Sequence, residues 1–522
     1  MKTYDKIIKG GLVYNGENTP PQKLDIAIIG DKISLLKENI DANLAQETIN
    51  AEGLIITPGF IDPHASTGFG YFYPNAADHK LYQGITTEIF GNCGTSPAPI
   101  GKYLNETMER LSSELEFPFD WSSTTEYFDR IQDKIQFNVA TLIGHSTLRS
   151  GFLSDWHNVS DTDLEGMKIE TAKAMDEGAL GISTGLIYSP GCFAKTEEIV
   201  ELTKIAASKG GLYASHIRNE REDIIEAIDE ALHIGDQANC RVLISHLKSA
   251  EQQNWGKVPA IIDKIEDYNK THDQKAWVDV YPYTAVSTKL RAFIPKSFLA
   301  DGIDNIPKKL KEETAINDIK AWIEMKGYEL DGMLVISNET DEKYINKTVV
   351  QIAEENNISL AQAIVNTLKA DSDTWVVYHC ISEKDMDYAI TWENAMICTD
   401  SWSYPINAPK VIGNPHPRSY GAFTTYLERY LINNKTLSIE EGIYKITHLP
   451  AKVFNLEGRG LLKEGHFADI VAFDWDTVKA NATYLDPKQF SDGVKHLWVN
   501  GTQLIKEGKI GNETPGKVLT LS

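Results

Sequence analysis

The sequence has few cysteines and no long stretch of apolar residues. Its five cysteines, Cys93, Cys192, Cys240, Cys380 and Cys398, are scattered through 522 residues. They are too few and too scattered for a disulfide framework, and their odd number leaves at least one unpaired, so a reducing compartment is expected. No apolar run approaches the roughly 20 residues that a membrane-spanning helix needs, and the amino-terminal residues are too charged for a signal peptide. We therefore expect a cytoplasmic protein with no membrane partner.

Basic residues are also scarce. The chain has 51 Lys and Arg against 74 Asp and Glu, which gives a net charge of −23. Such a surface repels phosphate backbones, and no Lys/Arg-rich block interrupts it, so a nucleic-acid partner is excluded. Repeats of fixed period and low-complexity segments are absent as well. The composition does not indicate an oligomeric state.

What the sequence does contain is a series of eight short apolar runs interleaved with helical segments. The runs cover residues 54–61, 85–90, 139–144, 179–183, 212–215, 242–245, 277–281 and 395–399. This alternation predicts an α/β fold, a (β/α)8 TIM barrel over residues 57–457. Residues 375–380 are a ninth candidate strand. The stretch of about 288–373 has helices and a strand of its own, so we interpret it as an insertion after strand 7, a candidate lid.

The two ends of the chain have a different texture. Strand-like runs there alternate with turn signals such as Asn15-Gly16 and Asn500-Gly501. Residues 1–56 and 458–522 are therefore predicted to form one small β-sandwich domain, completed only when both termini meet.

Two histidines each end a predicted strand. His216 follows residues 212–215 and His246 follows residues 242–245, with one predicted helix over 222–235 between them, ending at a Gly235 cap. A strand, helix and strand of this length form a right-handed crossover, so both imidazoles should emerge on the same rim. A lone histidine is more often a hydrogen-bonded core residue than a ligand. For two histidines that each end an adjacent strand, a metal site and a structural role are about equally favoured.

Further reactive side chains follow other predicted strands. His64 ends the first, Cys93 follows the second and Asp400 follows the eighth. One thiolate and two imidazoles suit Zn²⁺, and three protein ligands leave a position open for water or substrate. Such a site can hydrolyse an amide if a base is present, and Asp400 is placed to take the proton of the water and return it to the leaving nitrogen.

Several short motifs occur in the order found in the D-aminoacylases. They are ITPGFIDPH ending at His64, GNCG around Cys93, GISTGLIYSPG around Tyr188, HIRNE starting at His216, SHLK ending at Lys248, YPY starting at Tyr281, Asp400, and PHPR ending at Arg418. Any one motif is weak, but the ordered set is specific. Over nearly its whole length the sequence resembles the N-acyl-D-amino-acid deacylases of the amidohydrolase superfamily.

The resemblance implies a small-molecule N-acyl-D-amino acid as substrate and a role for each matched residue. Asp400 matches the catalytic aspartate, and Tyr188 matches a tyrosine that holds the scissile carbonyl oxygen. The matched ligands of a tightly bound zinc are Cys93, His216 and His246. The residues matched to the binding of the substrate α-carboxylate are Lys248, Tyr281, Ser287 and Arg418. From the residues alone, a buried aromatic at Tyr188 and a structural ion pair at Arg418 remain open.

One departure from the family lies at the end of the first strand. The family usually has His-X-His, whereas His64 is followed by Ala65 and Ser66, and serine is a poor zinc ligand. Residues 179–183 also contain no lysine that could be carboxylated to bridge two metals. We therefore expect one tightly bound Zn²⁺, with at most a weak second metal site at His64 and Asp400. Two other interpretations of Ser66 remain open, namely an altered substrate and a loss of activity.

Three functions remain as alternatives. The favoured one is zinc-dependent hydrolysis of N-acyl-D-amino acids. The second is a cyclic-amide hydrolase of the hydantoinase or dihydropyrimidinase kind, which the missing His-X-His and lysine disfavour. The third is a catalytically silent amidohydrolase-fold binding protein. Metal content distinguishes the third from the others, and a panel of acyl-D, acyl-L and cyclic substrates distinguishes the first two.

Overall fold

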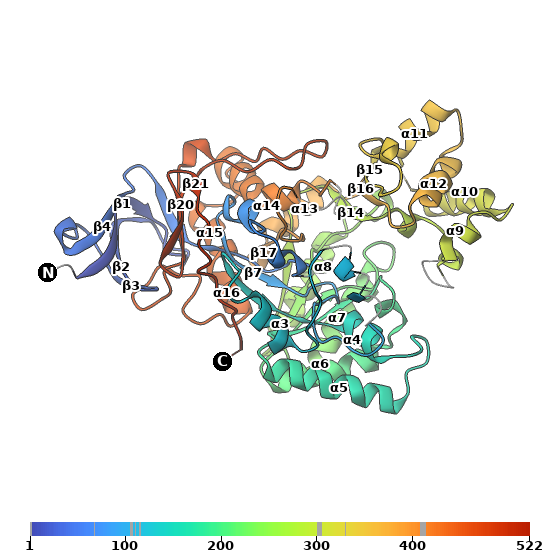
Figure 1. Cartoon of the computed structure of the whole chain (residues 1–522), viewed down its shortest axis with the longest axis horizontal. Helices are drawn as coiled ribbons and strands as arrows, with labels where there is room; N and C mark the ends of the chain where they lie inside the picture. The colour runs from blue at the N-terminus through green and yellow to red at the C-terminus, as the bar shows by residue number, and fades with distance from the viewer. Residues whose placement is uncertain are drawn as a thin grey trace.

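The computed structural model describes residues 3–66, 68–104, 108–109, 111–113, 116–299, 305–328, 330–407 and 414–521. A sheet built from both chain ends lies on the left in Figure 1, a region of alternating strands and helices lies in the centre, and a separate lobe lies at the upper right. Within the described ranges, no helix combines the length and apolarity needed to cross a bilayer.

Eight parallel strands build the centre, one at each predicted apolar run. In chain order they are β6 (Phe60–Asp62), β7 (Ile85–Phe90), β8 (Asn138–Thr141) continued by β9 (Ile143–Gly144), β10 (Gly181–Gly185), β11 (Leu212–His216), β12 (Val242–Ile244), β13 (Ala276–Val280) and β17 (Ala395–Ile397). Pairing runs from β6 through β7 to β8 and from β9 to β17, always parallel. A parallel bridge between Ala65 and Ser401 joins the two ends of the series. This is the strand order of a TIM barrel.

The first apolar run, residues 54–61, was predicted as one strand and is two. β5 (Ile55–Pro58) pairs with strands of the terminal sheet, whereas β6 pairs with β7 in the barrel. The break falls at Pro58-Gly59, where Pro58 has no N–H to donate. Gly59 passes so close to Thr86 that a Cβ atom would lie 2.0 Å from its hydroxyl oxygen. The chain therefore moves from one sheet to the next at a position that only glycine fits.

Helices of the barrel follow its strands. The longer ones are α3 (Thr124–Ile131), α4 (His145–Phe152), α5 (Asp161–Asp176), α6 (Thr196–Ser208), α7 (Ile224–Ala238), α8 (Val258–Thr271), α13 (Glu383–Thr391), α14 (Arg418–Tyr426) and α15 (Ile439–Ile446). The prediction that Gly235 caps α7 is wrong, because the helix continues to Ala238 and ends at Asn239 in the left-handed conformation. Gly235 instead allows close packing, since a Cβ atom there would lie 2.1 Å from the Val242 side chain.

Strands from both ends of the chain form one nine-stranded sheet. They are β1 (Tyr4–Val13), β2 (Gln22–Ile29), β3 (Lys32–Lys37), β4 (Ala45–Asn50) and β5, with β18 (Ile470–Phe473), β19 (Val494–Val499), β20 (Thr502–Lys506) and β21 (Lys509–Ile510). The two chain ends meet where β18 pairs with β5. We predicted a β-sandwich, but hydrogen bonding joins these strands into a single branched sheet. Its branch point is β1, whose register shifts between Ile8 and Gly11, so that its first half pairs with β4 and its second half with β5.

The lobe at the upper right of Figure 1 is inserted between β13 and β17. It contains an antiparallel sheet in the order β14 (Ala285–Lys289), β16 (Trp375–His379), β15 (Met333–Ser337). Its helices are α9 (Ile306–Lys309), α10 (Ala315–Lys326), α11 (Val349–Asn356) and α12 (Leu360–Ala370). The ninth apolar run is β16, and the insertion extends beyond the predicted residues 288–373 on both sides.

Candidate metal centre and substrate cavity

A cavity of about 710 Å³ opens beside the carboxyl ends of the barrel strands. Its walls come from the segments that follow β7, β10, β11, β12, β13 and β17, and from β14 and α10 of the inserted lobe. All but one of the predicted site residues line it: Cys93, Tyr188, His216, His246, Lys248, Tyr281, Ser287, Asp400 and Arg418, together with Ser66. His64 is fully buried directly behind this wall.

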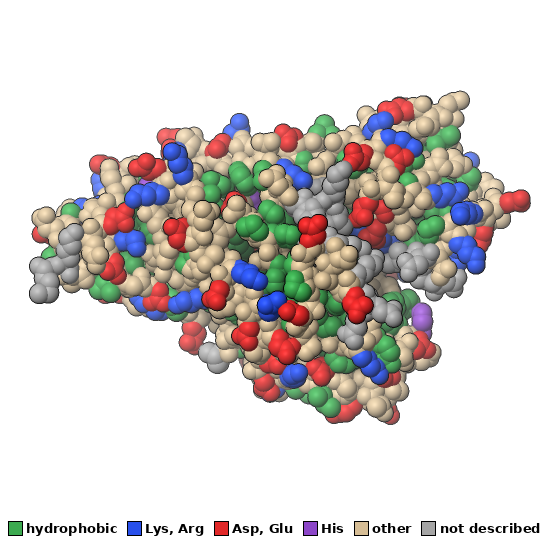
Figure 2. Space-filling view, in the orientation of Figure 1, with side chains coloured by type: hydrophobic (Ala, Val, Ile, Leu, Met, Phe, Trp, Pro, Cys, Tyr) green, Lys and Arg blue, Asp and Glu red, His purple; other side chains and the backbone are tan. Residues whose placement is uncertain are grey.

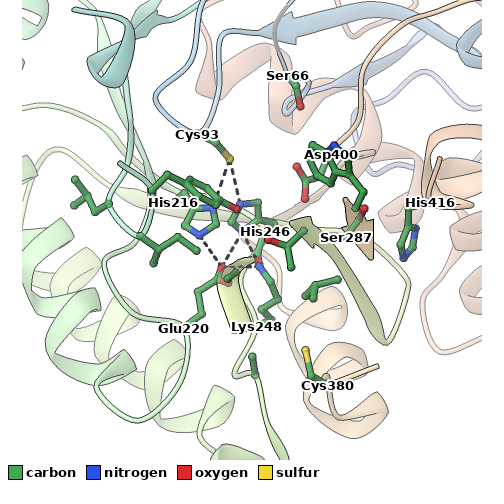
Figure 3. A pocket seen from close by; sticks show the side chains of 18 of the residues that line it. Ser66, Cys93, His216, Glu220, His246, Lys248, Ser287, Cys380, Asp400 and His416 are labelled. Carbon is green, nitrogen blue, oxygen red and sulfur yellow. Dashed lines mark hydrogen bonds and ion pairs between the residues drawn. The ribbon is translucent and has the colours of Figure 1, made fainter. Parts of the chain in front are cut away.

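The thiol of Cys93 lies among three imidazoles. Its Sγ atom is 3.3 Å from His246 Nε2, 3.6 Å from His216 Nδ1 and 3.3 Å from His64 Nε2. Figure 3 shows Cys93 facing His216 and His246 from the opposite side of the cavity to Glu220. Two of the three histidines, His216 and His246, lie more than 120 positions after Cys93 in the sequence.

This donor set fits a zinc ion. Zn–S bonds of about 2.3 Å and Zn–N bonds of about 2.0–2.1 Å in tetrahedral geometry hold sulfur and nitrogen about 3.6 Å apart. The separations around Cys93 are close to that value. Burial opposes ionisation of Cys93, but the neighbouring His64 and His246 and the hydrogen bonds from His216 and His246 hold the pKa of the thiol well below its usual value. The sulfur is therefore available as the thiolate that a metal binds.

A second set of donors overlaps the first. One atom each of His64, Cys93, His246 and Asp400 lies within 4.8 Å of the others, and the same holds for His216, Glu220 and His246. His64 Nε2 is 3.5 Å from Asp400 Oδ1. The predicted weak metal site at His64 and Asp400 thus shares Cys93 and His246 with the first site.

Three of these residues have a backbone conformation that is uncommon outside glycine. Cys93, His246 and Asp400 have φ angles of 52°, 36° and 44°. Non-glycine residues in the left-handed region cost about 1–3 kcal/mol each and persist only where their surroundings enforce them. Each lies two or three residues beyond the end of its strand, so the turn directs the side chain back toward the cavity.

Buried hydrogen bonds enforce these turns. The Ser183 hydroxyl on β10 donates to Gly91 O at 2.5 Å and accepts from Gly94 N–H at 3.0 Å, which spans the Cys93 turn. Asp279 accepts the His246 N–H at 2.7 Å, and His64 O accepts the Asp400 N–H at 3.0 Å.

Asp279 was missed by the sequence analysis. It lies on β13, has no exposed surface, and its carboxylate is 3.3 Å from His64 Nδ1. Asp279 therefore holds both the ring of His64 and the backbone of His246. Its one sequence signal was a carboxylate inside the otherwise apolar run 277–281, where an unpaired charge would be costly to bury.

Lys248 makes contacts behind His246. Its Nζ atom donates to Glu220 Oε1 at 2.6 Å and to His246 O at 2.9 Å, and it lies 2.8 Å from His246 Nδ1. Only 5% of Lys248 is exposed. Glu220 belongs to the HIRNE motif, but no role was predicted for it.

Arg418 holds Asp400. Arg418 Nη2 lies 3.0 Å from Asp400 Oδ2, and Arg418 Nε donates to Asp400 O at 2.9 Å. The guanidinium also lies 4.6 Å from the centre of the Tyr281 ring. Burial raises the pKa of Asp400, but Arg418, His246 and His64 together lower it below its usual value, so the carboxylate is ionised.

The remaining predicted residues lie around this centre. Tyr188 follows β10, is 40% exposed toward the cavity, and its ring contacts that of His216 edge to face at 4.9 Å between centroids. Ser287 lies on β14, so the inserted lobe contributes directly to the cavity. Figure 3 shows Ser66 set apart from the two histidines. Figure 2 shows acidic and basic side chains interspersed over the visible face.

Comparison with known proteins gives consistent matches. The sequence model of the amidohydrolase family matches residues 47–216 and 409–505. A D-aminoacylase of Alcaligenes xylosoxydans xylosoxydans is 30% identical over 520 residues, which is 99% of this chain and 97% of that protein. The crystal structure of an N-acyl-D-glutamate deacylase from Bordetella bronchiseptica, complexed with zinc and a phosphonate inhibitor, has a TM-score of 0.84 and 28% identity and covers 100% of both chains.

A further solved structure bears on the number of metals. It is a D-aminoacylase with a binuclear metal center, described as activated by one metal and attenuated by a second, with a TM-score of 0.83 and 27% identity over 99% of this chain and 100% of that chain. The likeness extends through the terminal sheet, the barrel and the inserted lobe.

Proposed function

Because this chain belongs to the N-acyl-D-amino-acid deacylase (D-aminoacylase) family of the amidohydrolases, we propose that it hydrolyses N-acyl-D-amino acids to a carboxylate and a free D-amino acid. The observation that carries the proposal is the convergence of a thiolate, imidazoles and an ionised carboxylate in one cavity. Cys93, His216 and His246 would hold one zinc ion. His64 and Asp400 would form a weaker second metal site, because Ser66 stands where the family has a second histidine.

Zinc supplies a Lewis acid that lowers the pKa of a water molecule and polarises the scissile carbonyl. Asp400 accepts the proton of the attacking water through a carboxylate oxygen and returns it to the leaving nitrogen. The Tyr188 hydroxyl donates to the carbonyl oxygen, where negative charge develops. The tyrosine's exposure to the cavity suits a group that meets substrate.

The α-carboxylate of the substrate binds among Arg418, Tyr281, Ser287 and Lys248. In the free protein, Arg418 is also the ion-pair partner of Asp400. A substrate carboxylate that binds Arg418 weakens the ion pair between Arg418 and Asp400. The pKa of Asp400 then rises, so Asp400 is a stronger base when substrate is bound.

A substrate panel tests the proposed function. Zinc-loaded protein should hydrolyse N-acetyl-D-amino acids with kcat/KM far above that for the L enantiomers, and should leave a cyclic ureide intact. Ninhydrin detection of the released amine measures deacylation, and chromatography of the cyclic ureide measures ring opening, which frees no amine. Preferential opening of the ureide would instead assign the hydantoinase type of activity, and no turnover of any substrate by zinc-loaded protein would reject catalysis.

Replacement of Arg418 by Ala tests the carboxylate site. A hydrogen bond to a charged group contributes about 1.5–3 kcal/mol, so KM for an N-acetyl-D-amino acid should rise roughly 10–150-fold. Since Arg418 also contacts Asp400, the control is the matching N-acetyl-D-amino acid amide, which lacks the carboxylate. If Arg418→Ala changes KM equally for both compounds, the residue does not bind the carboxylate.

A further inference from the structure

One carboxylate oxygen lies behind both imidazoles. Glu220 Oε1 is 3.1 Å from His246 Nδ1 and 3.7 Å from His216 Nε2. These are the nitrogens that face away from Cys93, because His246 presents Nε2 and His216 presents Nδ1 to the sulfur. Figure 3 shows Glu220 on the opposite side of the two rings from Cys93. The two histidines thus use opposite ring nitrogens and turn their remaining nitrogens toward the same oxygen.

This arrangement has a consequence for metal binding. An imidazole binds a metal through its unprotonated nitrogen, so the other nitrogen must carry the hydrogen. An acceptor at that second nitrogen fixes the tautomer, holds the ring and raises its basicity. Among the residues that the structure describes, His216 Nε2 is buried without a hydrogen-bond partner, and Glu220 Oε1 is the carboxylate oxygen facing it.

Glu220 could alternatively be a ligand of a separate ion held with His216 and His246, since their donor atoms lie within 4.8 Å of one another. That position already has a cation. The Lys248 ammonium lies 2.6 Å from Glu220 Oε1 and 2.8 Å from His246 Nδ1. Because the Lys248 ammonium already lies between these atoms, a metal ion is excluded from that position.

The backbone holds Glu220 at this place. It lies in the loop between β11 and α7, four residues after His216, and its carbonyl oxygen accepts the Ala250 N–H at 2.8 Å. The loops that follow the two histidines are therefore joined at Glu220.

We propose that Glu220 is a positioning residue whose Oε1 atom accepts the Nδ1–H of His246 and faces Nε2 of His216, and so selects the ring tautomers that bind zinc through Nε2 of His246 and Nδ1 of His216. Lys248 donates to the same Glu220 oxygen and holds the carboxylate in place. The inference rests on the metal site of the proposed function but not on its substrate.

Zinc affinity, measured by competition with a chromophoric chelator in the absence of substrate, tests the role of Glu220. Loss of such an acceptor weakens metal binding about 10–100-fold. Glu220→Met, which has no acceptor, should show this loss, whereas Glu226→Met, at an exposed position on α7, should bind zinc like the unmodified protein.

A second pair of variants separates this role from the stability of the Glu220–Lys248 ion pair. Glu220→Met leaves the Lys248 ammonium without its carboxylate. Lys248→Met is therefore compared with the Lys248→Met/Glu220→Met double variant, in which no ammonium remains. The double variant should bind zinc about 10–100-fold more weakly than Lys248→Met. Equal zinc affinity of these two proteins would overturn the proposal. If zinc affinity falls as expected but no substrate of the panel is hydrolysed, the proposed function is rejected and the role of Glu220 in zinc binding stands.

Discussion

Replacement of Asp400 by Asn should lower kcat for an N-acetyl-D-amino acid by about 10²–10⁴-fold, the usual contribution of a general base. Asn has nearly the shape of Asp, and its amide oxygen still accepts from Arg418, which lies 3.0 Å from the native carboxylate. The amide, however, does not take up the proton of the attacking water. Steady-state kinetics with the metal content measured in the same preparation provide the test.

Zinc retention makes this result interpretable. Asp400→Asn leaves the thiolate of Cys93 and the rings of His216 and His246 unchanged, so about one zinc per chain should remain. Asp229→Asn, at an exposed position on α7, controls for the loss of one carboxylate. An Asp400→Asn protein with full zinc and unchanged kcat would remove Asp400 from the mechanism.

The sequence predicted the barrel strands well because these strands are buried on both faces. β12, for example, has the sequence Val-Leu-Ile and is buried at all three positions, and such strands occur as continuous apolar runs that need no alternation to be recognised. Element boundaries were harder. The division of residues 54–61 at Gly59 and the true role of Gly235 both depend on how closely a neighbouring strand approaches, which a single sequence does not reveal.

The site was predictable to the extent that barrel topology brings strand ends together. That rule placed Cys93, His216, His246 and Asp400 around one cavity. It could not identify the residues that hold them, because Asp279 and Glu220 are recognisable only by the atoms they contact. Their partners lie up to 215 residues away in the sequence, and the direction of each side chain depends on strand register and turn conformation.

A buried lysine beneath the Asp400 turn connects the first, second and last strands. Lys80 is fully buried and lies 2.8 Å from carboxylate oxygens of both Asp62 and Glu88. It also donates to the Thr399 hydroxyl at 2.5 Å, and that hydroxyl donates to Asp62 at 2.5 Å. Thr399 directly precedes Asp400, and Asp62 is two residues before His64. The network therefore joins the strands that carry the base and the buried histidine.

Replacement of Lys80 by Met should reduce the free energy of unfolding by about 3–5 kcal/mol, because the carboxylates of Asp62 and Glu88 lose their buried cation. Burial lowers the pKa of Lys80, but Asp62 and Glu88 raise it above its ordinary value. Its contribution is therefore fully present below the unfolded-state pKa of about 10.4 and is lost only as pH rises through the still higher folded-state pKa. The deficit should accordingly persist across neutral pH in urea unfolding.

Two comparisons establish that the deficit comes from unpaired buried charge. Lys264→Met removes a half-buried lysine at the protein surface that pairs with the exposed Asp229 and should cost no more than about 1 kcal/mol. The Lys80→Met/Asp62→Asn/Glu88→Gln protein has no charge left in the network, so it should recover part of the loss despite three substitutions. Unfolding of Lys80→Met at the same urea concentration as the unmodified protein would show that the network contributes no stability. The join between the first and last barrel strands would then depend on backbone hydrogen bonds such as those from Asp400 N–H to His64 O and from Ser66 N–H to Ser401 O.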